Sequence, residues 1–301
     1  MQDSYFVSGG IPWRRFKEFI AVPADRFSVL KTLLEEAALD YSVQNIAGKR
    51  HFVVSPPRSG RPGRVIRHSP PLVLVAHYDR TEGSPGANDN SAGVFLLVET
   101  AMKLKAGGVE NWIIIFTDKE ELKPGESIQA QGSYSLATEL KKSMLKNVKI
   151  FSFDTCGTGD TLIISTTIEN LLKREGGGEK LRESLMELRK TALDTATDLG
   201  MAKVLLAPTP FSDDVGFFRA GLAAQTITML PSAECVRLVS ELRRNQDFPN
   251  TLINAGLRQP DREKFIPETW RYLNTSGDSH LRLTPKYFRI VARFAEALCK
   301  R

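Results

Sequence analysis

Histidine and carboxylate side chains follow a strongly apolar stretch in the first third of the chain. Residues 72–76 read Leu-Val-Leu-Val-Ala, and His77 and Asp79 come directly after them. A polar loop then leads to Asp89. An imidazole whose second nitrogen is held by a carboxylate, together with an aspartate that can bridge two cations, is a donor set that suits zinc. These residues therefore predict half of a metal site.

Two further apolar stretches also end in acidic residues. Residues 112–116 lead to Glu120 and Glu121, and residues 148–153 lead to Asp154. A single acid after a strand is usually a turn residue or a helix cap. Ligands of open α/β sheets bind beyond the carboxyl ends of the strands, so acids that follow three strands are expected to meet at one edge. Their repetition predicts a functional site there.

The elements around these residues predict an α/β fold. The continuous apolar run at 72–76 is typical of a central parallel strand that is covered on both faces. Apolar residues at the helical period predict amphipathic helices over 27–38, from 94 onwards and from Pro285 onwards. Asp25 is expected to cap the first of these helices.

Length and composition narrow the class of protein. With 301 residues, 42% of them hydrophobic, we expect a single domain, 1–301, with an excursion at about 232–270. The net charge of +6 is a small excess and predicts no nucleic-acid partner. No apolar run reaches the ~20 residues of a membrane span, and no signal-peptide pattern is present, which predicts a cytoplasmic protein without a membrane partner. The sequence gives no indication of the oligomeric state.

Four ordered motifs resemble those of the co-catalytic zinc aminopeptidase family, which also contains carboxypeptidase-like members and the glutaminyl-peptide cyclases. The similarity runs from about Phe27 to the C-terminus. The resemblance implies a three-layer α/β/α sandwich with a mostly parallel central sheet, a phosphorylase/hydrolase-like zinc peptidase architecture, and Zn2+ as the cofactor. The motifs are His77-Tyr78-Asp79, Gly-Ala-Asn-Asp-Asn-Ser-Ala-Gly at 86–93, Asp118-Lys119-Glu120-Glu121, and Asp154.

The resemblance also implies a role for each metal-binding residue. Asp89 would bridge two zinc ions. His77 and Glu121 would complete the site of one ion, and Asp154 would bind the other. Clustered carboxylates repel one another, so a cation among them is expected on physical grounds as well.

Two residues would act beside the metal ligands. The resemblance implies that Glu120 is the general base and that Asp79 is the partner of His77. Adjacent glutamates that leave a strand point in different directions, so Glu121 can bind metal while Glu120 takes a proton from the attacking water.

One family ligand is replaced. The family's last ligand is a histidine in a His-Thr-x-x-Asp segment, and Asn274 stands at this position. An amide oxygen is a poor substitute for imidazole on zinc, so we expect one tight site and one weak or empty site. His280 is an alternative donor, although a lone histidine is more often structural. Asp213 matches a Ser-Asp-His segment of the family, in which Asp214 replaces the histidine.

The predicted function is hydrolysis of a peptide or an aminoacyl amide by an aminopeptidase-like, zinc-dependent enzyme. Two alternatives stay open. The stretch Gln-Gly-Ser-Tyr-Ser-Leu-Ala at 131–137 looks more like the cyclase branch, which predicts a glutaminyl-peptide cyclase-like acyltransferase. The loss of the histidine at Asn274 suggests instead a degenerate relative that binds peptide or metal without catalysis.

Overall fold

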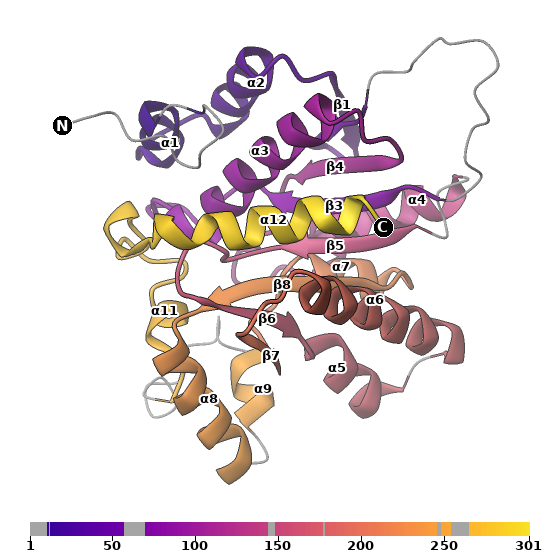
Figure 1. Cartoon of the computed structure of the whole chain (residues 1–301), viewed down its shortest axis with the longest axis vertical. Helices are drawn as coiled ribbons and strands as arrows, with labels where there is room; N and C mark the ends of the chain where they lie inside the picture. Colours follow the sequence, from indigo (N-terminus) through magenta and orange to yellow (C-terminus); the bar gives the residue numbers. More distant parts are fainter. Residues whose placement is uncertain are drawn as a thin grey trace.

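The structure, a computed structural model, describes residue 11 and residues 13–56, 70–143, 148–176, 178–245, 248–253 and 265–301 (Figure 1). Within these residues the chain forms an eight-stranded sheet with the spatial order β1-β2-β4-β3-β5-β8-β6-β7. The strands are β1 (Tyr41–Ile46), β2 (Lys49–Val54), β3 (Leu72–His77), β4 (Trp112–Thr117), β5 (Lys149–Phe153), β6 (Thr161–Ser165), β7 (Val204–Ala207) and β8 (Ala224–Leu230).

Strand β3 lies inside the sheet, as its apolar run predicted. It pairs in parallel with β4 on one side and with β5 on the other, and β5 pairs in parallel with β8. Strands β1, β2 and β6 add antiparallel pairings, so the sheet is mixed but mostly parallel. The register Val75↔Ile115 and Val75↔Ser152 brings the carboxyl ends of these three strands side by side.

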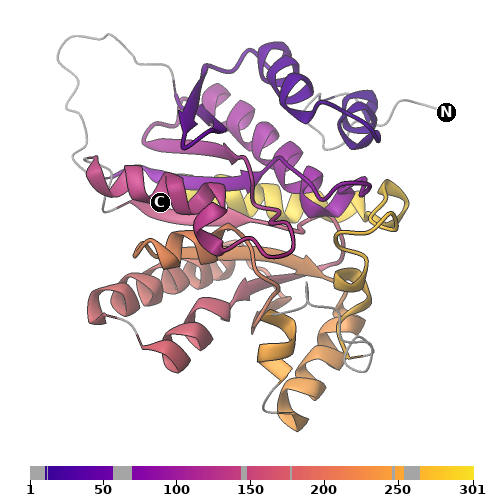
Figure 2. The same cartoon turned by 180° about the vertical axis from the view of Figure 1, so that it is seen from behind.

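Helices cover both faces of the sheet, which confirms the predicted three layers (Figures 1 and 2). Alternate residues of β3 point into different cores. Leu74 packs in the core beneath α3 and α12, whereas Val73 and Val75 pack beneath α4 and α7. The helices are α1 (Trp13–Ile20), α2 (Arg26–Glu36), α3 (Ala92–Ala106), α4 (Gly132–Lys142), α5 (Thr167–Glu175), α6 (Glu179–Asp198), α7 (Asp213–Arg219), α8 (Ser232–Arg244), α9 (Phe248–Ile253), α11 (Glu268–Arg271) and α12 (Phe288–Cys299).

The N-terminal helices pack on α3. Phe16 and Phe19 of α1 meet Phe95 edge to face, with ring centroids 5.1 and 5.6 Å apart. Asp25 caps α2, as predicted, because its Oδ1 accepts the backbone N–H of Ser28 at 3.3 Å. These contacts hold the first residue of α2 close to the end of β3.

The segment 232–270 contributes α8, α9 and α11. Leu238, Phe248 and Trp270 form a separate small core with residues of β6, β7 and β8. The single domain with this excursion stays a prediction. None of the helices in the described parts of the chain is long and apolar enough to cross a membrane.

Candidate active site

Side chains from the ends of β3 and β5 and from the loop after β3 meet at one point. His77 Nε2 lies 3.1 Å from Asp89 Oδ1 and 3.5 Å from Asp154 Oδ1, and all three side chains are buried. One donor atom of each lies within 4.8 Å of the other two. A tetrahedral zinc ion with bonds of about 2.0–2.2 Å separates its ligand atoms by about 3.3 Å. The three donors therefore have the spacing that one divalent cation requires.

The chemistry of these donors also fits a cation. Both ring nitrogens of His77 and Oδ1 of Asp154 are buried, and although carboxylates lie 3.1–3.5 Å from the imidazole, none of these three atoms makes a hydrogen bond of good geometry with the described residues. Burial opposes a proton on His77, but the carboxylates of Asp154, Asp79 and Asp89 outweigh it and raise the pKa of His77. Burial and the charge of Asp154 raise the pKa of Asp89. A bound cation would relieve this repulsion.

Asp79 connects the histidine to the two glutamates. Its Oδ1 lies 3.4 Å from His77 Nδ1, which is the predicted contact. Its two oxygens accept the backbone N–H groups of Glu120 and Glu121, each at 3.0 Å. Burial alone would raise the pKa of Asp79, but His77 and these N–H groups hold it below its ordinary value. One carboxylate therefore contacts both the imidazole and the backbone of the glutamate pair.

Glu120 is buried, and a side-chain amide holds its carboxylate. Gln131 Nε2 donates to Glu120 Oε1 at 2.8 Å and to the backbone oxygen of Glu120 at 3.2 Å. Ser133 Oγ donates to Gln131 Oε1 at 3.0 Å, which fixes the amide with its NH2 group toward Glu120. Burial, with the charges of Glu121 and other carboxylates, raises the pKa of Glu120. A carboxyl group in this setting suits proton transfer.

The grouping of ligands differs from the one expected from the sequence. The resemblance placed Glu121 with His77 and Asp89, and it placed Asp154 at the other ion. In the structure Asp154 is the third member of the group that contains His77, and Glu121 is not part of it. Both β4 and β5 pair with β3, so the reason is the position after the strand: Asp154 directly follows β5, whereas Glu121 lies beyond a turn after β4.

Glu121 and Asn274 are instead joined by a threonine. Thr81 Oγ1 lies 3.0 Å from Glu121 Oε2 and 2.7 Å from Asn274 Oδ1, and it can donate its one proton to either oxygen. Burial, and then the charge of Asp89, raise the pKa of Glu121. Glu121 and Asn274 therefore lie near each other, with a hydroxyl between them.

The other sequence candidates lie outside the metal group. His280 packs edge to face with Trp13, with ring centroids 6.1 Å apart. Asp213 Oδ2 accepts a hydrogen bond from Thr117 Oγ1 at 2.7 Å. Burial raises the pKa of Asp213 to about 6 and that of Asp214 to about 7.

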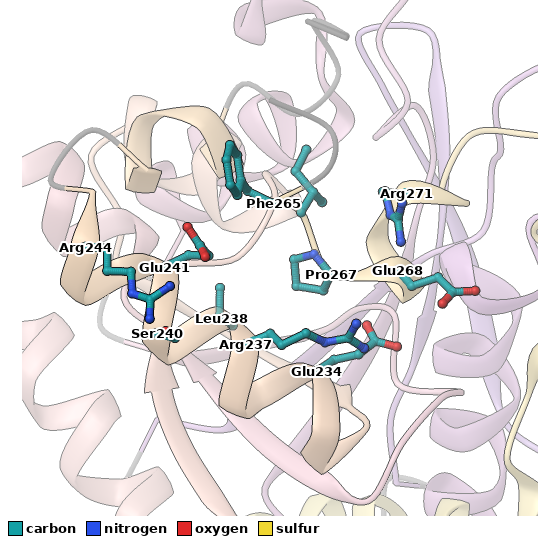
Figure 3. Close-up of a pocket in the computed structure, with 11 residues that line it drawn as sticks. Glu234, Arg237, Leu238, Ser240, Glu241, Arg244, Phe265, Pro267, Glu268 and Arg271 are labelled. Atoms are coloured by element: carbon teal, nitrogen blue, oxygen red, sulfur yellow. The ribbon is translucent and has the colours of Figure 1, made fainter. Parts of the chain in front are cut away.

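A cavity of about 220 Å³ lies between α8 and residues 265–271 (Figure 3). Arg237, Glu241 and Arg271 line it together with Phe265. None of the candidate site residues is among its lining residues. This cavity in the predicted excursion is therefore separate from the metal group.

Sequence analysis missed the functional contacts of Thr81, Gln131, Asp278 and Arg26. Thr81 lies near a motif residue, but a polar residue in a loop carries no signal of its own. Gln131 begins the stretch 131–137, but its contact with Glu120 was not predicted. Asp278 stands at the last position of the segment that begins with Asn274, but no sequence pattern predicts that its oxygens accept the backbone N–H groups of Asn88 and Asp89. Arg26 begins an amphipathic helix, where an arginine is normally expected at the surface.

Comparison with known proteins identifies the family and agrees with the fold. The model of peptidase family M28 matches residues 63–298. Aminopeptidase YwaD of Bacillus subtilis (strain 168) is 28% identical over 195 residues, which is 64% of this chain. The match covers 36% of YwaD, so the chain spans about a third of the length of this relative.

Solved structures share the fold over nearly the whole chain. A leucine aminopeptidase precursor from Bacteroides thetaiotaomicron VPI-5482 superposes with a TM-score of 0.61 at 15% identity, and the alignment covers 96% of both chains. A glutaminyl cyclase from Bacteroides thetaiotaomicron gives a TM-score of 0.61 at 16% identity, again over 96% of both chains. At these identities the likeness shows the fold alone.

The contacts of Asp79 generate a first prediction. In Asp79→Asn an NH2 group replaces one acceptor oxygen, so one of its two backbone N–H partners loses its acceptor. We expect the zinc affinity, measured by competition with a chromophoric chelator, to fall by about 10- to 100-fold.

Asp118→Asn is the matched control, because Asp118 Oδ2 accepts the backbone N–H of Arg50 at 3.0 Å on the neighbouring strand. It should keep the affinity of the wild type. Equal affinities for Asp79→Asn and the wild type would contradict the orienting role.

Proposed function

Because the chain belongs to peptidase family M28, we propose that it is a zinc-dependent hydrolase of the aminopeptidase type that cleaves a peptide or an aminoacyl amide. The observation that carries the proposal is the spacing of His77, Asp89 and Asp154, which suits one divalent cation, next to a buried Glu120. The proposal is also supported by the similarity to aminopeptidase YwaD.

His77, Asp89 and Asp154 would hold the ion. A bound zinc ion supplies two kinds of chemistry, since it lowers the pKa of water toward ~7 and polarises a carbonyl oxygen. Asp79 keeps the imidazole of His77 oriented, and its own low pKa keeps it ionised for this task. A cation held by these residues would also explain why several carboxylates can be buried together at this edge of the sheet.

Glu120 is the proposed general base. It takes a proton from the attacking water and returns it to the amine that leaves, so that no net proton is consumed by the residue. The Gln131 amide fixes one carboxylate oxygen at 2.8 Å, which leaves the other free to face the reacting groups. Glu121 has a different task, because its backbone N–H is held by Asp79 while its side chain turns to Thr81.

We propose that a second ion, if bound, is bound weakly. Asp89, Glu121 and Asn274 would be its donors, and Asn274 offers a neutral amide in place of the family's histidine. The Thr81 hydroxyl already engages both Glu121 and Asn274. An ion at this position would have to displace these hydrogen bonds.

Glu120→Gln tests the catalytic proposal. The amide keeps the shape of the side chain but cannot take up the proton, so turnover of aminoacyl p-nitroanilides should fall by about 10²- to 10⁴-fold. Zinc content, measured by elemental analysis, should be unchanged. Glu139→Gln, on the exposed surface of α4, is the control and should behave as the wild type. Full activity of Glu120→Gln would rule out the assigned role.

A cyclase reaction is the second candidate, because glutaminyl cyclases share the fold over the same 96% of the chain as the aminopeptidases. A peptide with N-terminal glutamine separates the two. The proposed hydrolase releases free glutamine, whereas a cyclase releases ammonia and leaves a blocked N-terminus. Measurement of both products by mass spectrometry and an ammonia assay should show the free amino acid.

Zinc binding without turnover of any member of a broad peptide library would favour a non-catalytic binding protein instead.

Asn274→His should restore the second site. Asn274 has a left-handed φ of 61°, a region in which histidine is also tolerated. We expect the zinc content at saturation to rise from about one to about two equivalents per chain. Asn111→His is the matched control, since Asn111 also has a positive φ of 68° but lies before β4, at the opposite end from Glu120. A content of one equivalent in both variants would show that Asn274 does not limit the second site.

A further inference from the structure

A buried arginine lies against the loop that carries Asp89. Arg26 is the first residue of α2, and it is only 5% exposed. In Figure 1 its helix is part of the N-terminal region that packs beside α3. Its terminal nitrogens donate to five neutral oxygens, namely the backbone oxygens of Tyr78 (3.2 Å), Asp79 (2.8 Å), Pro85 (2.7 Å) and Gly86 (3.0 Å) and the hydroxyl of Ser91 (2.8 Å).

These five acceptors belong to two different pieces of the metal site. Residues 78–79 continue β3 just after His77, and residues 85–91 form the loop that contains Asp89. Nη1 binds the first piece and Nη2 binds the second. The planar guanidinium therefore fixes the distance between the backbone that carries His77 and the backbone that carries Asp89.

The loop is shaped to receive this guanidinium. Gly86 has a φ of 56°, and a Cβ at this position would lie 2.7 Å from Arg26 Nη2 and 2.5 Å from the backbone oxygen of Asp89. The Phe19 ring covers the other side, with its centroid 4.6 Å from the central carbon of the guanidinium. A side chain larger than hydrogen at Gly86 would push the arginine out of the loop.

The charge of Arg26 also matters here. Burial, and then the charge of Arg80, lower its pKa to about 9, and the carboxylates of Asp79 and Asp89 act in the opposite direction. Arg26 is therefore still charged at neutral pH. It places a fixed positive charge behind a group of acids whose own repulsion would otherwise open the loop.

A carboxylate anchors the same loop independently. The two oxygens of Asp278 accept the backbone N–H groups of Asn88 and Asp89, each at 2.9 Å. Arg26 holds backbone oxygens of the loop, whereas Asp278 holds its N–H groups. Asp89 is thus fixed by two side chains that are far apart in the sequence.

We propose that Arg26 is a positioning residue of the metal centre, and that it presets the separation of His77 and Asp89 before any ion binds. This inference rests on the proposed metal site. Arg26 lies outside residues 63–298, which match the family model, so the helices α1 and α2 supply a part of the centre that the matched region does not contain.

Arg26→Lys tests the proposal, because lysine keeps the charge but its single ammonium group cannot replace the two guanidinium nitrogens that bind the two backbone segments. We expect zinc to bind about 10- to 100-fold more weakly in a competition with a chromophoric chelator. The visible spectrum of the Co2+-loaded protein should also change, since it reports the geometry of the ligands. Thermal unfolding without metal, followed by circular dichroism, establishes that the variant is folded at the temperature of the assays.

Arg15→Lys is the matched control. Arg15 pairs with Glu36 between α1 and α2, so this variant perturbs the same helices without touching the Asp89 loop. It should keep both the zinc affinity and the Co2+ spectrum. If Arg26→Lys does not fold, Ser91→Ala decides, because it removes one acceptor of Arg26, together with the hydrogen bond that Ser91 Oγ donates to the Gly86 backbone oxygen, and should weaken zinc binding in the same direction.

The outcomes are distinguishable. A folded Arg26→Lys variant with the zinc affinity and Co2+ spectrum of the wild type would overturn the positioning role and leave the proposed function intact. If Arg26→Lys is unfolded, a Ser91→Ala variant with the zinc affinity of the wild type would likewise overturn the positioning role and leave the proposed function intact. A wild-type protein that binds no zinc would contradict the metal centre itself, and this inference with it.

Discussion

Repulsion between buried carboxylates is the constraint on which the rest of the structure depends. Asp89 and Glu120 are buried and Glu121 is partly buried, and desolvation together with the charges of neighbouring carboxylates raises the pKa of each of them. The protein offsets this repulsion in three ways: hydrogen bonds from backbone and amide groups, the imidazole of His77, and the buried charge of Arg26. A divalent cation is the strongest remaining source of compensation.

The same constraint explains how the loop between β3 and α3 is built. An aspartate that is to share a cation with His77 cannot be left on a mobile loop, because its neighbours would repel it. The loop is tied to α2 through Arg26, to the C-terminal region through Asp278, and to β5 through Asn90, whose Nδ2 donates to the backbone oxygen of Phe153 at 2.8 Å. Preorganisation of this kind lowers the cost of binding an ion.

Family membership and local chemistry answer different questions about this chain. The fold and the order of the motifs are those of peptidase family M28. At the position proposed for a second ion, Thr81 Oγ1 lies within hydrogen-bond distance of both Glu121 and Asn274. A fold can keep its sheet while such side chains change, so the proposed weak second site rests on these few contacts rather than on the fold.

The sequence alone determined the strands, their polar ends and the class of chemistry. An uninterrupted apolar run predicts a buried parallel strand because both of its faces must be covered, and the residues after it must then lie at the edge of the sheet. Tertiary structure alone decided which of these residues meet. Strands β4 and β5 both flank β3, but Asp154 directly follows β5 whereas Glu121 lies beyond a turn after β4, and Asp154 is the residue that joins His77. The proposed role of Arg26 likewise depends on packing, because no local sequence pattern predicts which backbone oxygens will lie within hydrogen-bond distance of its guanidinium.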